Sequence, residues 1–196
     1  MNRTSLFKLA APLVGLSLAL SACGSGADTA SPAPQATVKG ISTQHDDADV
    51  TFIKDMSPHH SGAIAMAELA PTRAANAGVK AIAVEIAGAQ GPELARMKDM
   101  AEAWGVELTA GGGPSMGGSG MSGSMGDDAA ALRPLTGAAF DREFLTRMIA
   151  HHSSAVTMSQ AELAAGQNAQ GKELAQQIVT GQQAEITRMK ALLAGL

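Results

Sequence analysis

The chain has 196 residues and a formal net charge of −4 at pH 7, with 4 Phe, 1 Trp and no Tyr. Its hydrophobic content of 45% comes mostly from Ala and aliphatic residues, a composition that favours helices over sheets. The sequence holds no basic block, which argues against nucleic acid as a partner.

The N-terminus resembles the leader of a bacterial lipoprotein. Arg3 and Lys8 precede an apolar run, Leu9 to Leu20, that is short for a transmembrane helix. The run leads to Cys23, the only cysteine, in a Leu-Ser-Ala-Cys sequence similar to a lipobox. We therefore predict a signal peptide over 1–22, lipidation of Cys23, and an exported protein anchored to the cell membrane on its extracellular or periplasmic side. The alternative is an ordinary secretory signal with an incidental cysteine.

Composition divides the remaining chain. Residues 23–45 begin with a Ser-, Ala-, Pro- and Gly-rich stretch and are expected to form a flexible tether. The folded domain is expected over 46–196, with a first repeat at 46–106, a Gly- and Met-rich linker at 107–134 and a second repeat at 135–196. The linker's Gly- and Ser-rich part, 111–126, is not expected to form a packed element.

The two repeats match without a gap at a constant offset of 92 residues. The matched pairs are Asp49 and Asp141, Phe52 and Phe144, Met56 and Met148, His59-His60 and His151-His152, Met66 and Met158, Gln90 and Gln182, Glu93 and Glu185, and Met97 and Met189. A register held across so many residue types indicates a duplication.

Each repeat reads as two helices. The apolar spacing predicts helices ending at Ala67 and spanning about 79–104 in the first copy, and about 138–165 and up to 193 in the second. Pro58 either starts the first helix or lies within it; we favour a continuous helix with a local kink. Two Ala-rich hairpins bury their apolar faces by packing together, which predicts an all-α four-helix bundle with a pseudo-twofold axis.

Histidine and methionine recur together on these helices. Met56 and His60 are neighbours at i and i+4, His59 and Met66 are seven residues apart, and the second copy repeats both spacings. The predicted metal ligands are His59, His60, Met56, Met66, His151, His152, Met148 and Met158, with Met97, Met189, Met116, Met121, Met125 and His45 as additional candidates.

Thioethers and imidazoles form a soft to borderline ligand set, which suits copper, above all Cu(I), although another transition metal is open. Zinc gains little from methionine. A di-iron centre needs Glu-x-x-His on two helices, and the sequence contains none; Glu93 and Glu185 are its best carboxylate candidates.

Each part of the pattern has a structural alternative. Methionine fills irregular cores without binding metal, and the linker methionines are open to a similar reading as tolerated residues. The histidine pairs, if buried, need partners for their ring nitrogens. A metal is one solution, and hydrogen bonds to Asp49, Asp141 or the glutamates are another.

The repeated pattern Asp-x-x-Phe-x-x-x-Met-x-x-His-His-x-x-Ala-x-x-Met, at 49–66 and 141–158, resembles the bacterial family named domain of unknown function 305 (DUF305). Gln-x-x-Glu-x-x-x-Met at 90–97 and 182–189 resembles its second helix. The resemblance implies a ferritin-like four-helix bundle, exported and often lipid-anchored, in a family suspected of handling copper. It carries over no catalytic mechanism.

The sequence therefore favours a membrane-anchored protein that binds and buffers copper, rather than an enzyme. Two alternatives stay open: a metal-dependent redox enzyme of the cell envelope, and an interaction module whose histidines are structural. The oligomeric state is also open, and a homodimer is compatible with the sequence.

Overall fold

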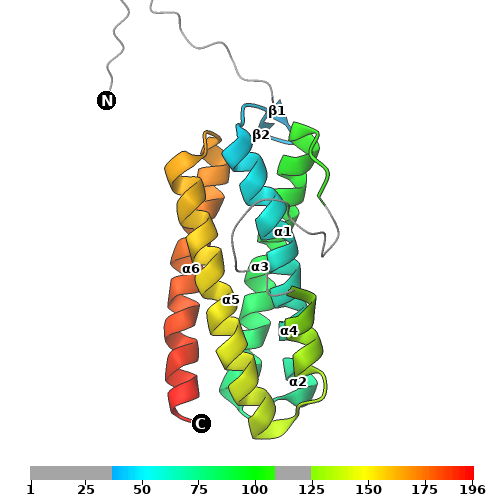
Figure 1. Cartoon of the computed structure of the whole chain (residues 1–196), viewed down its shortest axis with the longest axis vertical. Coiled ribbons are helices and arrows are strands. Elements are labelled where there is room, and N and C mark those ends of the chain that lie inside the picture. Colours follow the sequence, from blue (N-terminus) through cyan, green and yellow to red (C-terminus); the bar gives the residue numbers. More distant parts are fainter. Residues whose placement is uncertain (1–36, 109–124) are drawn as a thin grey trace, which may run out of the picture. The chain divides into compact units, whose positions relative to one another are not determined.

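The computed structural model describes residues 37–108 and 125–196 and shows the expected all-α bundle (Figure 1). Its four long helices are α1 (Asp47–Ala67), α3 (Ala77–Trp104), α5 (Gly137–Ala165) and α6 (Ala169–Ala194). The short elements are the strands β1 (Thr37–Val38) and β2 (Ile41–Ser42) and the helices α2 (Ala70–Arg73) and α4 (Met125–Leu132).

The long helices form two hairpins that pack against each other. α1 packs on α3 in the first repeat and α5 packs on α6 in the second, while α1 meets α5 and α3 meets α6 across the two repeats. α1 and α5 lie side by side in opposite directions (Figure 1). The middle of one histidine-bearing helix therefore faces the middle of the other.

Helix α1 is continuous through Pro58, as predicted. Its start is fixed by a capping box: the Asp46 side chain accepts from the N–H of Ala48 and Asp49, and the Asp49 side chain accepts from the N–H of Asp46 at 2.8 Å. These bonds satisfy donors that a helix start leaves free.

The matched aspartates Asp49 and Asp141 fasten the hairpins together. Asp49 of the first repeat accepts hydrogen bonds from the N–H of Gln167 and Asn168, at the turn of the second repeat. Asp141 of the second repeat accepts from the N–H of Ala75 and Asn76, at the turn of the first. Each repeat therefore has one aspartate that accepts hydrogen bonds from the hairpin turn of the other repeat. We call each of these two sets of contacts, made by Asp49 and by Asp141, a latch.

The structure corrects two boundaries. Residues 37–45, assigned to the tether, are packed: strands β1 and β2 pair antiparallel, Ile41 is buried, and the Trp104 indole N–H donates to the Ser42 carbonyl at 2.9 Å. An apolar side chain and a hydrogen-bonded hairpin hold this segment where a tether was expected. The turn at Lys39 and Gly40 has positive φ at both positions, a conformation that hairpin turns require.

The second correction concerns the linker. Its C-terminal part forms α4, which packs on α1 and α5, with Ala129 and Leu132 buried in the core. The run of Ala and Leu after the glycines supplies helix propensity and an apolar face. None of the helices in the described part of the chain combines the length and hydropathy of a membrane span.

Candidate metal centre

The four paired histidines lie in one buried row where α1 crosses α5. The ring centroids of His59 and His151 are 3.6 Å apart, and each pair within a helix is separated by 6.5 Å. His60 and His152 at the ends of the row have no exposed surface, and the inner two are nearly as buried. The antiparallel helices therefore join the two copied motifs at their histidines.

Glutamates hold the two ends of the row. His60 Nε2 is 2.9 Å from Glu93 Oε2 on α3, and His152 Nε2 is 2.8 Å from Glu185 Oε2 on α6. A carboxylate only accepts hydrogen bonds, so each Nε2 carries a proton, and in the neutral ring Nδ1 keeps its lone pair. Of the carboxylates considered as partners of the histidines, the glutamates therefore take this place, whereas Asp49 and Asp141 bind the helix turns.

A hydroxyl fixes the third ring. Ser154 Oγ donates its single proton to the His151 carbonyl oxygen at 3.1 Å and lies 2.6 Å from His59 Nε2. With the Ser154 proton on that carbonyl, His59 Nε2–H donates to Ser154 Oγ and the neutral ring keeps a lone pair on Nδ1. The Nδ1 atoms of His59, His60 and His152 are buried without a hydrogen-bond partner among the described residues, as are both ring nitrogens of His151.

Burial also keeps the inner rings neutral. Burial, together with the positive charge that a protonated His151 would place beside it, lowers the pKa of His59 to about 2. Burial likewise lowers the pKa of His151 to about 3, reinforced by His152. Metal ligation requires the unprotonated imidazole, so these rings are in the binding form at neutral pH.

Methionines flank the row on both sides and fall into two clusters. Met56, Met97 and Met100 are fully buried in one cluster, against which Met158 packs. Met66, Met148 and Met189 are fully buried in the other. Each cluster thus combines methionines of one repeat with the second methionine on the histidine-bearing helix of the other, because α1 and α5 run antiparallel.

Sequence reasoning missed a further buried polar pair. Gln90 and Gln182 are 1% and 3% exposed, and neither amide has a hydrogen-bond partner in the part of the chain described. Each lies one turn before the glutamate that holds a histidine. The sequence feature that could have pointed to them is that the two glutamines occupy matched positions in the two repeats. Buried amides of this kind need a hydrogen-bond partner, which a water molecule or a ligand can supply.

The remaining candidates lie elsewhere. His45 stacks on Trp104 with ring centroids 4.8 Å apart, and its Nδ1 lies 2.8 Å from the Thr43 carbonyl oxygen. Cys23, Met116 and Met121 fall outside the described residues, as does the side chain of Met125. Within 37–108 and 125–196, no group of three or more His, Cys, Asp or Glu side chains is arranged to hold a metal ion.

Fold and centre together define a duplicated four-helix bundle with a histidine row between two methionine clusters. The family model described as "Domain of unknown function (DUF305)" matches residues 49–193. The chain therefore belongs to the DUF305 family, as the repeated motif predicted. No curated protein matches the sequence significantly.

Solved structures agree with this assignment. A DUF305 fragment from Deinococcus radiodurans is 28% identical, with a TM-score of 0.66, over 77% of this chain and 98% of that chain. CopM in its Cu(II)-bound form is 34% identical, with a TM-score of 0.65, over 75% of this chain and 96% of that chain. CopM in its Cu(I)-bound form is 31% identical, with a TM-score of 0.62 over the same shares.

Proposed function

We propose that this protein binds copper at the histidine row and the methionines beside it, and so buffers the ion or passes it on. The observation that carries the proposal is the set of buried Nδ1 lone pairs on His59, His60 and His152, which no hydrogen bond within the described residues satisfies. Imidazole with thioether is a ligand set suited to copper. CopM, a similar protein, has been solved with Cu(II), Cu(I) and silver.

The hydrogen bonds around the row also fit a metal centre. Histidine ligands commonly donate the second ring N–H to a carboxylate, which orients the ring and makes the ligating nitrogen more basic. Glu93 and Glu185 occupy this position toward His60 and His152. The paired glutamates therefore support ligation through Nδ1.

The proposal includes the place of action. The leader over 1–22 and Cys23 at its end favour export and a lipid anchor, which would hold the bundle at the outer face of the membrane. This part rests on the sequence alone. Mass spectrometry of membrane-extracted protein tests it: a mature chain beginning at an acylated Cys23 supports the anchor, and an unmodified cysteine contradicts it.

The direct test of copper binding is titration of the purified protein with Cu(I) and Cu(II). We expect uptake by the wild type and its loss when His59, His60, His151 and His152 are all changed to Ala. The matched control is His45→Ala, which removes a histidine outside the row and should leave uptake unchanged. Equal uptake by the wild type and the fourfold variant, or none by either, would contradict the proposal.

A second variant guards against misfolding. Met56→Leu with Met97→Leu conserves volume and should keep the core packed, while it removes two thioethers. We expect weaker Cu(I) binding with an unchanged circular dichroism spectrum. A ligand that binds only the native state must raise the melting temperature. If the histidines only specify the fold and bind no copper, adding copper will therefore leave the melting temperature unchanged.

A further inference from the structure

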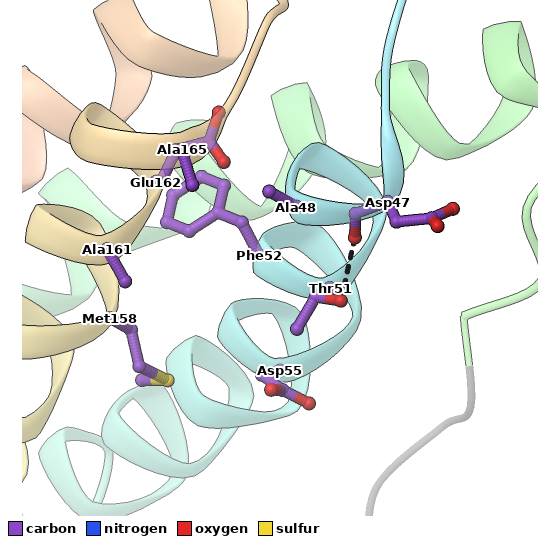
Figure 2. A pocket seen from close by; sticks show the side chains of 9 residues that line it. All are labelled: Asp47, Ala48, Thr51, Phe52, Asp55, Met158, Ala161, Glu162 and Ala165. Carbon is purple, nitrogen blue, oxygen red and sulfur yellow. Dashed lines mark hydrogen bonds between the residues drawn. The ribbon is translucent and has the colours of Figure 1, made fainter.

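The two ends of the bundle are unlike, although the duplication should make them equivalent. A pocket of about 360 Å³ opens between α1 and α5 at the end where α1 begins (Figure 2). Asp47, Phe52 and Asp55 of α1 and Met158 of α5 are among the residues that line it. Figure 2 shows Phe52 reaching from α1 toward α5, with Met158 on the α5 wall.

Met158 connects this pocket to the core. Its side chain lines the pocket and is half-buried, whereas its counterpart Met66 has no exposed surface. Met158 also packs against the cluster that contains Met56 and Met97. A thioether that faces a pocket on one side and the buried methionines on the other is placed to pass a soft ion inward.

The charges at the two ends also differ. The pocket is lined by the carboxylates of Asp47 and Asp55. At the matching positions of the second repeat stand Ala139 and Arg147. Carboxylates around a pocket raise the local concentration of cations. The Asp55 end therefore attracts a metal ion more strongly than the other end, where the arginine pairs with nearby carboxylates.

Helix α4 covers the second end. Arg147, the counterpart of Asp55, forms ion pairs with Asp128 of α4 and with Glu143. Ala129 and Leu132 of α4 are buried in the same cluster as Met66. Among the described residues that precede α1, the strands β1 and β2 stand where α4 precedes α5, and no helix is found there.

We propose that the pocket lined by Asp55 and Met158 is the port through which a soft monovalent metal ion reaches the bundle, and that the Met66 end is closed by α4. The inference rests on the proposed function, which it deepens by assigning a direction to metal uptake. Met158 is then the first ligand that an incoming ion meets, and the Met56 cluster is loaded before the Met66 cluster.

The test uses the full chain with 13C-labelled methionine methyl groups and redox-inert Ag(I) as the probe. In substoichiometric titrations the Met158 methyl signal should shift before that of Met66. Met158→Leu and Met66→Leu form a matched pair for stopped-flow transfer of Cu(I) from a chromophoric chelator. We expect Met158→Leu to slow the initial uptake more strongly than Met66→Leu does.

Asp55→Arg gives the port the residue type found at the matching position of the closed end, Arg147. It should slow uptake roughly tenfold at low salt, with the difference disappearing as salt screens the charge. Simultaneous shifts of both methyl signals, or equal slowing by both leucine variants, would overturn the port and leave copper binding intact. No binding of Ag(I) or Cu(I) by the wild type would overturn both proposals.

Discussion

Asp49 accepts a hydrogen bond of 3.0 Å from the backbone N–H of Asn168, and the Asn168 side chain in turn caps the start of α6. The second copy mirrors this relationship: Asp141 accepts from the N–H of Asn76, whose side chain caps α3. Both aspartates are buried. These hydrogen bonds connect the start of each histidine-bearing helix to the hairpin turn of the other repeat. They therefore fix how α1 and α5 are aligned along their length, and so which residues of the two helices face each other.

Loss of one latch should destabilise the protein. Asp141→Ala leaves the backbone N–H groups of Ala75 and Asn76 without their acceptor. Hydrogen bonds to a charged group contribute about 1.5–3 kcal/mol each, so we expect the free energy of unfolding to fall by about 3 kcal/mol. Urea denaturation measures the change. Asp49→Ala should cost at least as much, because Asp49 also accepts from the backbone N–H of Asp46 in the capping box; a negligible cost of either variant would contradict this account.

Glu162 should make stability depend on pH. Burial, together with the neighbouring Asp49 carboxylate, raises the pKa of Glu162 from 4.5 to about 8. A raised folded-state pKa favours folding below pH 4.5, and this contribution is lost as the pH rises through about 8. Glu162→Gln removes the titration, so its stability relative to the wild type should increase from pH 5 to pH 8.5.

The difference in stability between the variant and the wild type is measured from their urea midpoints at the two pH values. Other groups that titrate in this range affect both proteins equally and cancel in the difference. Glu107→Gln, at an exposed position, is the control and should show a constant difference. A constant difference for Glu162→Gln would mean that the carboxyl group is not destabilised by its surroundings.

The sequence predicted the bundle because its signals are local and repeated. Apolar spacing and the 92-residue offset fixed the four long helices to within a few residues. The two His-His pairs could be placed on the apolar faces of α1 and α5 from their spacing alone. The continuity of α1 through Pro58 also followed, because the matching Ala150 gives no reason for a break.

What depends on contacts between distant segments could not be predicted. The sequence placed Asp49 on the same helix as His59, as one candidate partner of the histidines, but in the structure Asp49 binds the turn at Asn168, more than a hundred residues away. The burial of Gln90 and the packing of α4 are likewise set by the arrangement of helices. Spacing along one helix indicates which residues share a face, but the crossing of two helices decides what that face meets.

Helix α4 should contribute to stability as a packed element. Leu132→Ala removes a fully buried side chain from the cluster that contains Met66. Such a truncation costs about 2–5 kcal/mol, depending on how far the cavity collapses. Urea unfolding measures it, and Ala130→Gly at an exposed position of α4 is the control, expected to cost about 1 kcal/mol. A negligible effect of Leu132→Ala would show that α4 does not pack on the core in solution.

The glutamates that hold the histidine row should tune copper affinity. In Glu93→Gln the amide replaces the carboxylate that accepts from His60 Nε2, which weakens the orientation of the ring and lowers the basicity of Nδ1. Changes to such partners typically cost about 10–100-fold in metal affinity. We expect a loss of this size for Cu(I) in competition with a chromophoric chelator, and the same for Glu185→Gln.

Glu173→Gln provides the control for these variants, because Glu173 lies on α6 and pairs at the surface with Arg96. It should leave copper affinity unchanged, while circular dichroism should report the same helix content for all three variants. If Glu93→Gln and Glu185→Gln bind copper as tightly as the wild type, ligation does not pass through His60 and His152. If only one of them loses affinity, the two ends of the row are not equivalent, and the centre is a single site displaced toward that end.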